Sequence, residues 1–198
     1  MLIFGSSIPK RMDSKRLAGK SGITVINLAE GGASIGDVMK HMDAFSTHQH
    51  EYFKSEGAIR LDDMNITKVI ISVGTNDVLN ARARASSFYI PLQNLMRKAN
   101  LLFGCRVYFQ SLIPIPSQPK HVAKSVYEFN DIAVKARRSE RCYFIDVFDK
   151  FLECRNFSKF FVIKRNAIDI HPNRLGQSIM ARAFIPIIRN YFDPHQHS

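Results

Sequence analysis

The fold is decided by the stretch Lys68-Val69-Ile70-Ile71-Ser72-Val73, which runs directly into Gly74-Thr75-Asn76-Asp77. Its nearly continuous apolar, β-branched run is typical of a strand buried on both faces of a parallel sheet. The glycine and polar residues that follow are turn formers and mark the end of this strand. Ligands bind outside the carboxyl ends of strands in open α/β sheets, so this end predicts part of a functional site.

Similar runs elsewhere in the chain predict four more strands, at Met1–Phe4, Ile23–Leu28, Arg106–Ile113 and Tyr143–Val147. Helix-period apolar patterns lie between and after them, at 88–102, 122–136 and 175–183, and Pro186 is expected to kink or end the last helix. This alternation predicts an α/β fold with helices on both faces of the sheet. We expect a three-layer α/β/α sandwich with a mainly parallel five-stranded sheet, flavodoxin-like, in one domain over residues 1–198.

Composition narrows the class of protein. The 198 residues are 45% hydrophobic, and none of the apolar runs reaches the roughly 18 residues that span a bilayer. The opening residues are too short an apolar run for a secretory signal. Cys105, Cys142 and Cys154 are odd in number and lack metal-type spacing, which argues against a disulfide framework and favours a reducing compartment. We therefore expect an intracellular, cytoplasmic protein.

The chain is strongly basic, with a formal net charge of +11 and a pI of about 9.8. A field of this sign favours contact with nucleic acid or an anionic surface. The basic residues are spread along the chain and form no basic tail, which is equally typical of a solvated basic surface. Both interpretations stay open.

Three further short segments, besides Gly74–Asp77, contain residues that could take part in catalysis. They are Gly5-Ser6-Ser7, the stretch from Asn27 to Gly32, and Asp169-Ile170-His171-Pro172-Asn173. A serine at a strand-to-helix turn can be an exposed nucleophile, and a histidine in a loop before a helix can be its base. A glycine amide and an asparagine amide suit an oxyanion hole. Taken singly, the same residues are typical of a helix cap, a surface histidine and turns.

Together the four segments resemble the four sequence blocks of the SGNH (GDSL-type) hydrolase family, in family order and across nearly the whole chain. The first block reads Phe4-Gly5-Ser6-Ser7-Ile8 and the second ends in Gly31-Gly32. The third is Gly74-Thr75-Asn76-Asp77, and the fourth contains Asp169-Ile170-His171. Similar small hydrolase domains occur as parts of viral and mobile-element proteins, and a chain cut from a larger protein is compatible with a strand at Met1.

The resemblance implies a role for each matching residue. Ser7 would be the nucleophile and His171 its general base. The backbone N–H groups of Ser7 and Gly32 and the side-chain amide of Asn76 would form the oxyanion hole. The implied reaction passes through an acyl-enzyme and needs no metal and no cofactor.

Two residues depart from the family pattern. Ser6 stands where the family usually has Asp, and Ile168 stands where the family acid precedes the histidine by three residues. The nearest carboxylate is Asp169. Three arrangements are compatible with this offset: Asp169 substitutes through a different backbone path, a backbone carbonyl orients His171 in a Ser–His dyad, or the site is impaired.

Other signals are interpreted as structural. His48 and His50, and His195 and His197, lack supporting ligands at metal-type spacing and are expected to be surface histidines. Phenylalanines between Phe148 and Phe161 are expected in the core, with an acyl-contacting lid or membrane-facing surface as the alternative. Residues 46–66 and 151–168 are candidates to cover the site.

We therefore expect a serine esterase or deacylase that hydrolyses a carboxylic ester through Ser7, His171 and Asp169. Its substrate would be a small ester or an acylated carbohydrate or lipid. The alternative is a catalytically impaired SGNH-like module that binds a partner or a polyanion. A flavodoxin-like binding fold shares the architecture but leaves His171 and Asn76 unexplained.

Overall fold

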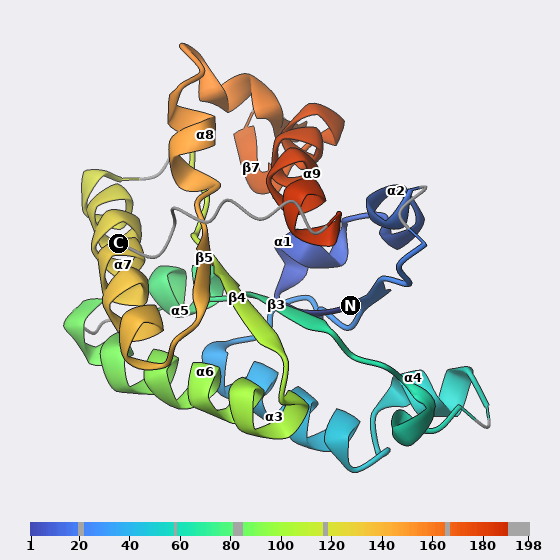
Figure 1. Cartoon of the computed structure of the whole chain (residues 1–198). Coiled ribbons are helices and arrows are strands. Elements are labelled where there is room, and N and C mark those ends of the chain that lie inside the picture. The colour runs from blue at the N-terminus through green and yellow to red at the C-terminus, as the bar shows by residue number, and fades with distance from the viewer. Residues whose placement is uncertain (20–21, 58, 81–84, 117–118, 165–166, 190–198) are drawn as a thin grey trace.

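Five parallel strands form the central sheet of the computed structural model (Figure 1). The structure describes all residues except 20–21, 58, 81–84, 117–118, 165–166 and 190–198. The strands are β1 (Leu2–Gly5), β2 (Ile26–Asn27), β3 (Lys68–Ser72), β4 (Arg106–Gln110) and β5 (Tyr143–Ile145). Their order, β2-β1-β3-β4-β5, places β1 and β3 side by side in the sheet. The expected parallel five-stranded α/β architecture is confirmed.

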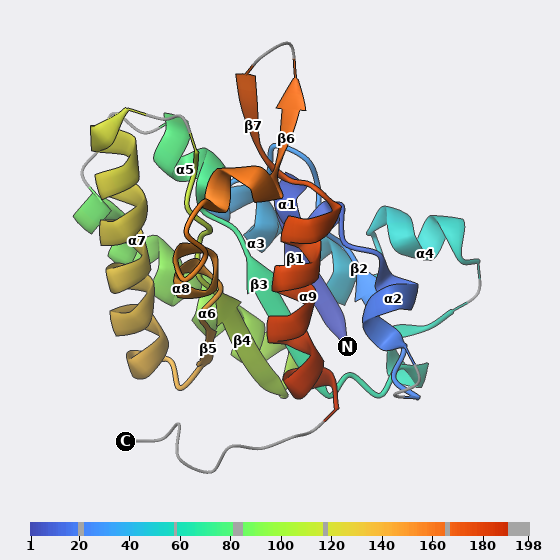
Figure 2. The same cartoon turned by 90° about the horizontal axis from the view of Figure 1, so that it is seen from above.

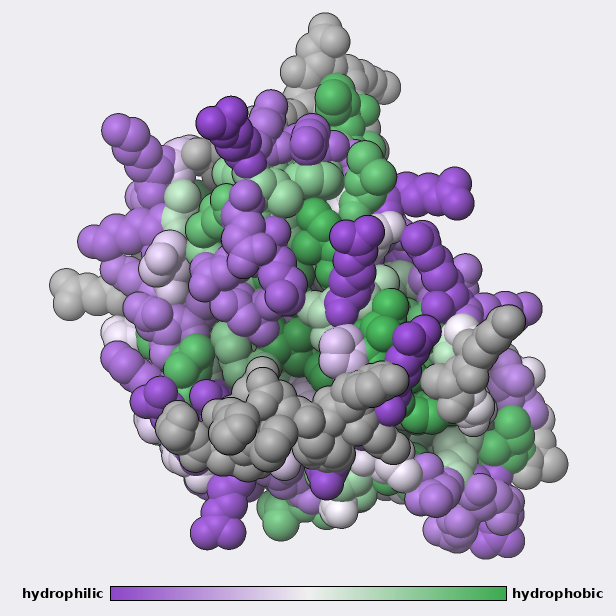
Figure 3. Space-filling view, turned by 45° about the horizontal axis from the view of Figure 1, so that its top comes forward, coloured by the Kyte–Doolittle hydropathy of each residue, from purple (hydrophilic) through white to green (hydrophobic). Residues whose placement is uncertain are grey.

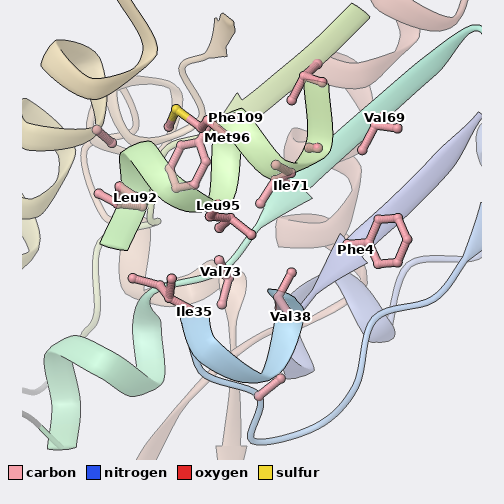
Figure 4. Packing of buried hydrophobic residues seen from close by; sticks show 14 of the residues in the cluster. Phe4, Ile35, Val38, Val69, Ile71, Val73, Leu92, Leu95, Met96 and Phe109 are labelled. Carbon is pink, nitrogen blue, oxygen red and sulfur yellow. The ribbon is translucent and has the colours of Figure 1, made fainter. Parts of the chain in front are cut away.

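Alternate residues of the three central strands, β1, β3 and β4, pack into two separate cores, as the period of two of a β-strand requires. Phe4, Val69, Ile71 and Phe109 belong to one core cluster, whereas Ile3, Ile70 and Tyr108 belong to the other. Figure 4 shows the first of these, in which side chains of the helices at 35–46 and 89–103 pack against the strands. Burial on both faces explains why the strands read as continuous apolar runs.

Helices cover both faces of the sheet (Figure 1). The first core is covered by α3 (Ile35–Ser46), α5 (Thr75–Asn80), α6 (Tyr89–Phe103) and α7 (Lys120–Ser139). The second core is covered by α1 (Ser7–Lys10), α2 (Ser14–Ala18), α8 (Phe148–Leu152) and α9 (Arg174–Ile188). The short helix α4 (Glu51–Ser55) follows α3, and 3-10 turns lie at Leu61–Asp63, Ala85–Phe88 and Phe157–Phe160. The last helix continues past Pro186 to Ile188.

A separate antiparallel hairpin, β6 (Phe161–Lys164) and β7 (Ala167–Pro172), was not expected from the sequence. Phe161 pairs with Pro172 and Ile163 with Ile168. Figure 2 shows the two strands projecting beyond the helices, with their base beside α1 and α9. The expectation that His171 lies in a loop is therefore wrong, because this residue belongs to β7.

The structure also places the phenylalanines and histidines for which the sequence predicted a core or a surface position. Phe148, Phe151 and Phe161 are buried, which confirms core packing for these three, and Phe157 and Phe160 pack partly buried against the same core. His48 is exposed, but His50 is buried and accepts the N–H of Tyr52 as the cap of α4, so the surface assignment was wrong for His50. His195 and His197 lie outside the described residues.

The surface seen in Figure 3 is mostly hydrophilic, with smaller hydrophobic areas between the polar side chains. In the part of the chain that the structure describes, no helix is long and apolar enough to cross a membrane. Cys105, Cys142 and Cys154 are all free thiols. Burial raises the pKa of the Cys142 thiol to about 11.

Candidate active site

Ser7 lies at the first residue of α1, directly after β1. The turn is tight because β1 and β3 run close together here: Gly5 pairs with Ser72, and the N–H of Ser6 donates to the Ser72 carbonyl at 3.1 Å. A side chain at position 5 would collide with that carbonyl and with Pro9, so glycine is required. The turn thus presents Ser7 at the carboxyl edge of the sheet.

His171 joins Ser7 to Asp169 by two hydrogen-bond distances. Its Nε2 lies 2.9 Å from the Ser7 Oγ, and its Nδ1 lies 2.8 Å from the Asp169 Oδ1. The His171 and Asp169 side chains are each 15% exposed. Three residues from opposite ends of the chain therefore form one continuous polar chain, as geometry for acyl transfer requires.

The strand geometry of β7 explains why Asp169 reaches the histidine from two residues away. Side chains at i and i+2 of a β-strand point to the same face, so Asp169 and His171 are neighbours there. A spacing of three residues between acid and histidine suits a loop, and a loop is the conformation that we expected for His171 from the sequence. Asp169 at the ring nitrogen is the contact that the first of the three arrangements, in which Asp169 substitutes for the family acid, predicts.

Asn173 fixes the end of this strand. Its Oδ1 accepts the N–H groups of Leu175 and Gly176, which caps α9. Its Nδ2 donates to the carbonyls of Lys159 and Phe161 at 2.8 and 3.1 Å. One side chain thereby ties the start of β6 to the start of α9, with His171 between them. The sequence signal for this role was an asparagine just before a helical pattern.

The loop that carries Gly32 is tied to the end of β1, which leads into Ser7. The N–H of Glu30 donates to the carbonyl of Gly5 at 2.9 Å, and Gly32 has φ of +81°, a backbone conformation that favours glycine. The Asn76 side chain, in the first turn of α5, donates to the Ala33 carbonyl at 3.0 Å. An asparagine amide has two N–H donors, so this bond leaves one for another acceptor.

Two residues that the sequence did not single out hold the site together. Asn27 donates to the carbonyls of Pro9 and Met12 at 2.8 and 3.2 Å, and so anchors the end of α1. Asp77 accepts the N–H of Ile35 at 3.1 and 3.2 Å and joins α5 to α3. Both lie inside sequence motifs in which neighbouring residues were considered for catalysis. The N–H and C=O groups at the ends of helices need partners from outside the helix, and asking which side chains supply them could have identified both residues.

Part of the segment 46–66, a candidate to cover the site, lies beside the loop that carries Gly32. Residues 50–55 face residues 27–30 across a cavity of about 520 Å³, so they border the loop that precedes Gly32. Within the described ranges, no group of three or more His, Cys, Asp or Glu side chains is placed to hold a metal ion.

Comparison with solved structures gives close matches in fold. A lipolytic protein of the G-D-S-L family from Veillonella parvula is 18% identical, with a TM-score of 0.72 over 94% of this chain and 96% of the other. A lipase/acylhydrolase from Enterococcus faecalis is 15% identical, with a TM-score of 0.69 over 98% of each chain. A variant of an acetyl xylan esterase from Geobacillus stearothermophilus is 16% identical, with a TM-score of 0.64 over 94% and 93%.

Comparison of sequences identifies a family but no individual relative. No curated protein sequence matches the chain. The model of the GDSL-like lipase/acylhydrolase family matches residues 10–179, which include Gly32, Asn76, Asp169 and His171 and begin just after Ser7. The match covers most of the chain, which therefore belongs to the GDSL-like lipase/acylhydrolase family of ester-bond hydrolases.

Proposed function

We propose that the protein is a serine esterase or deacylase that hydrolyses a carboxylic ester through an acyl-enzyme on Ser7. The observation that carries the proposal is the pair of short distances that joins Ser7, His171 and Asp169. Family membership supports ester hydrolysis in general, and this geometry supports the serine mechanism in particular.

Proton transfer follows from the two contacts of His171. With Nδ1–H donating to Asp169, the neutral imidazole leaves Nε2 free to accept the Ser7 hydroxyl proton. The Ser7 oxygen attacks the ester carbonyl, the C–O bond to the alcohol breaks, and His171 returns the proton to the departing alcohol. A water molecule, deprotonated by the same nitrogen, then attacks the acyl carbon. The bond from this carbon to the Ser7 oxygen breaks, His171 returns the proton to Ser7, and the acid is released.

The negative charge on the carbonyl oxygen needs hydrogen-bond donors. We assign the Ser7 and Gly32 N–H groups and the second amide N–H of Asn76 to this role. The hydrogen bonds from Glu30 to Gly5 and from Asn76 to Ala33 support the assignment, because they bring the Gly32 loop to β1 and to α5.

The proposed substrate is a small ester or an acylated carbohydrate or lipid. The acetyl xylan esterase among the similar structures is an enzyme for an acylated carbohydrate, which makes acetylated sugars a first class to assay. The net charge of +11 also favours contact with nucleic acid or an anionic surface, a property independent of catalysis.

Labelling with a fluorophosphonate probe tests the nucleophile. We expect the folded wild type to be labelled and Ser7→Ala not to be labelled. Ser6→Ala is the matched control, because it removes one hydroxyl oxygen from the buried residue next to Ser7. Labelling of this variant should persist. Equal labelling of wild type and Ser7→Ala, or a folded wild type that never reacts, would refute the assignment of Ser7.

A further inference from the structure

Two adjacent side chains at the start of α5 reach the same loop. Asn76 donates to the carbonyl of Ala33 at 3.0 Å, and the Asp77 carboxylate accepts the N–H of Ile35 at 3.1 and 3.2 Å. The segment in question, residues 31–35, contains Gly32 and ends with Ile35, the first residue of α3. In the following we name residues 31–35 the oxyanion loop, because this inference rests on the function proposed above.

The oxyanion loop packs into the first core at Ala33 and Ile35, which are 5% and 2% exposed, but its two glycines have no such packing. Gly31 and Gly32 are exposed, and among the described residues nothing lies within 4 Å of the place where either would carry a Cβ. The position of the Gly32 N–H is therefore set by the residues on either side of the glycine pair, through their hydrogen bonds and the packing of Ala33. Upstream, Glu30 is bonded to Gly5; downstream, the loop is bonded to Asn76 and Asp77.

The downstream attachment has a firm base. Gly74, which precedes α5, has φ of +121° and lies against the ring of Phe129 from α7, so the start of α5 is held by the core. Ile35 is itself 2% exposed, and its N–H belongs to the first turn of α3, where no helix partner exists. A buried donor of this kind needs an acceptor, and Asp77 supplies it.

The helix α3 also has a cap of its own, which serves a different purpose. Ser34 and Asp37 form a capping box, with the Ser34 Oγ 2.7 Å from the Asp37 Oδ2. This cap joins Ser34, at the end of the loop, to the first turn of α3 and makes no link to α5. Asp77, by contrast, sets where α3 and the oxyanion loop stand relative to Asn76.

We propose that Asp77 is a positioning residue for the reaction, which holds the Gly32 N–H and the Asn76 amide at the spacing that the developing oxyanion requires. It touches neither substrate nor reacting atoms and acts through Ile35 and the loop before it. Because the oxyanion exists only on the way to the tetrahedral intermediate, loss of this spacing should lower kcat and leave KM nearly unchanged.

Four variants test the proposal with p-nitrophenyl acetate as substrate. Asp77→Ala removes the acceptor, and we expect kcat to fall by about tenfold to 100-fold, less than the loss of an oxyanion donor itself, with KM within about twofold. Asp77→Asn keeps an acceptor oxygen and should recover most of kcat. Asp77→Glu keeps the acceptor but displaces it by one methylene, and should also lower kcat. It tests the same contact if Asp77→Ala does not fold.

The matched control is Asp37→Ala, which removes the other carboxylate at the start of α3. It should lower Tm and leave kcat close to wild type. The proposal is overturned if Asp77→Ala and Asp77→Glu turn over like wild type, if their loss lies in KM, or if Asp37→Ala loses kcat equally. A wild type without Ser7-dependent turnover would instead refute the proposed function, so the two failures are distinguishable.

Discussion

At the scale of single residues, Asp169 is the member of the site whose role can be tested most directly. Asp169→Asn keeps the size of the side chain and removes its charge, so the imidazole loses both its preferred tautomer and the stabilisation of its protonated form. We expect kcat to fall by roughly 10³ to 10⁴, by analogy with the corresponding change in a serine protease. Steady-state kinetics with p-nitrophenyl acetate, supported by a thermal melt to show that the variant is folded, measure the effect.

The double variant Ile168→Asp/Asp169→Ala is the control for position. It places a carboxylate at the usual family spacing, three residues before His171. In a β-strand that carboxylate would lie on the opposite face from His171, so we expect no recovery of kcat. Recovery to near wild type would mean that the backbone here follows a loop path in solution.

These residues also show what sequence alone can reach. Ser7, Gly32, Asn76 and His171 were predicted because the stretches that contain them resemble, in type and order, the four sequence blocks of the SGNH family. The face on which Asp169 lies could not be predicted, because it depends on whether residues 167–172 are strand or loop. Asp77 and Asn27 were missed because their partners are backbone groups more than ten residues away, which no local pattern reveals.

At the scale of elements, the strands were predicted where burial on two faces makes them continuous apolar runs. The ends of these strands were not predicted, because beyond them the buried backbone N–H and C=O groups bond to side chains and not to a neighbouring strand. After β4, Ser111 accepts the N–H groups of Val147 and Phe148, and Asn130 bonds both backbone groups of Leu112. The hairpin β6–β7 was missed because it is a two-stranded sheet separate from the main sheet. Most of it lies in residues 151–168, which were considered only as a segment that could cover the site.

The contact between α5 and α3 predicts a pH dependence of stability. Burial raises the pKa of Asp77 above its ordinary value, the Ile35 N–H opposes this, and the charge of Asp37 adds to it. The native state then keeps this proton to a higher pH than the unfolded state. Its contribution to stability is present below the ordinary pKa and is lost as pH rises through the raised one.

Asp77→Asn cannot ionise and keeps an acceptor for Ile35. We therefore expect the free energy of unfolding of Asp77→Asn, minus that of wild type, to increase as pH rises from about 3 towards neutrality. Urea denaturation of both proteins across this range measures the difference directly, and carboxylates elsewhere cancel in the subtraction. A difference that shrinks with rising pH would show that ionised Asp77 is favoured in the native state.

At the scale of the whole molecule, the charge of +11 is the property that the active site does not explain. Around α1 and α2 it is concentrated: Lys10, Arg11, Lys15 and Arg16 are exposed, and the intervening Asp13 is occupied in capping α2. On α7, Lys135 and Arg138 are exposed as well, beside acidic neighbours. The α1–α2 corner therefore presents four exposed basic side chains that phosphate groups could neutralise.

We expect single-stranded DNA or RNA to bind this corner weakly and with steep salt dependence, since each neutralised phosphate contributes about −0.7 to the slope of log K against log salt. Fluorescence anisotropy at several salt concentrations gives the slope for wild type and for Lys10→Glu/Arg11→Glu/Lys15→Glu. The triple variant should have a shallower slope by about two, while Lys135→Glu/Arg138→Glu should change it less. Absence of binding at low salt would remove nucleic acid as a partner, and equal effects of the two variants would mean that net charge, and not this corner, attracts the polyanion.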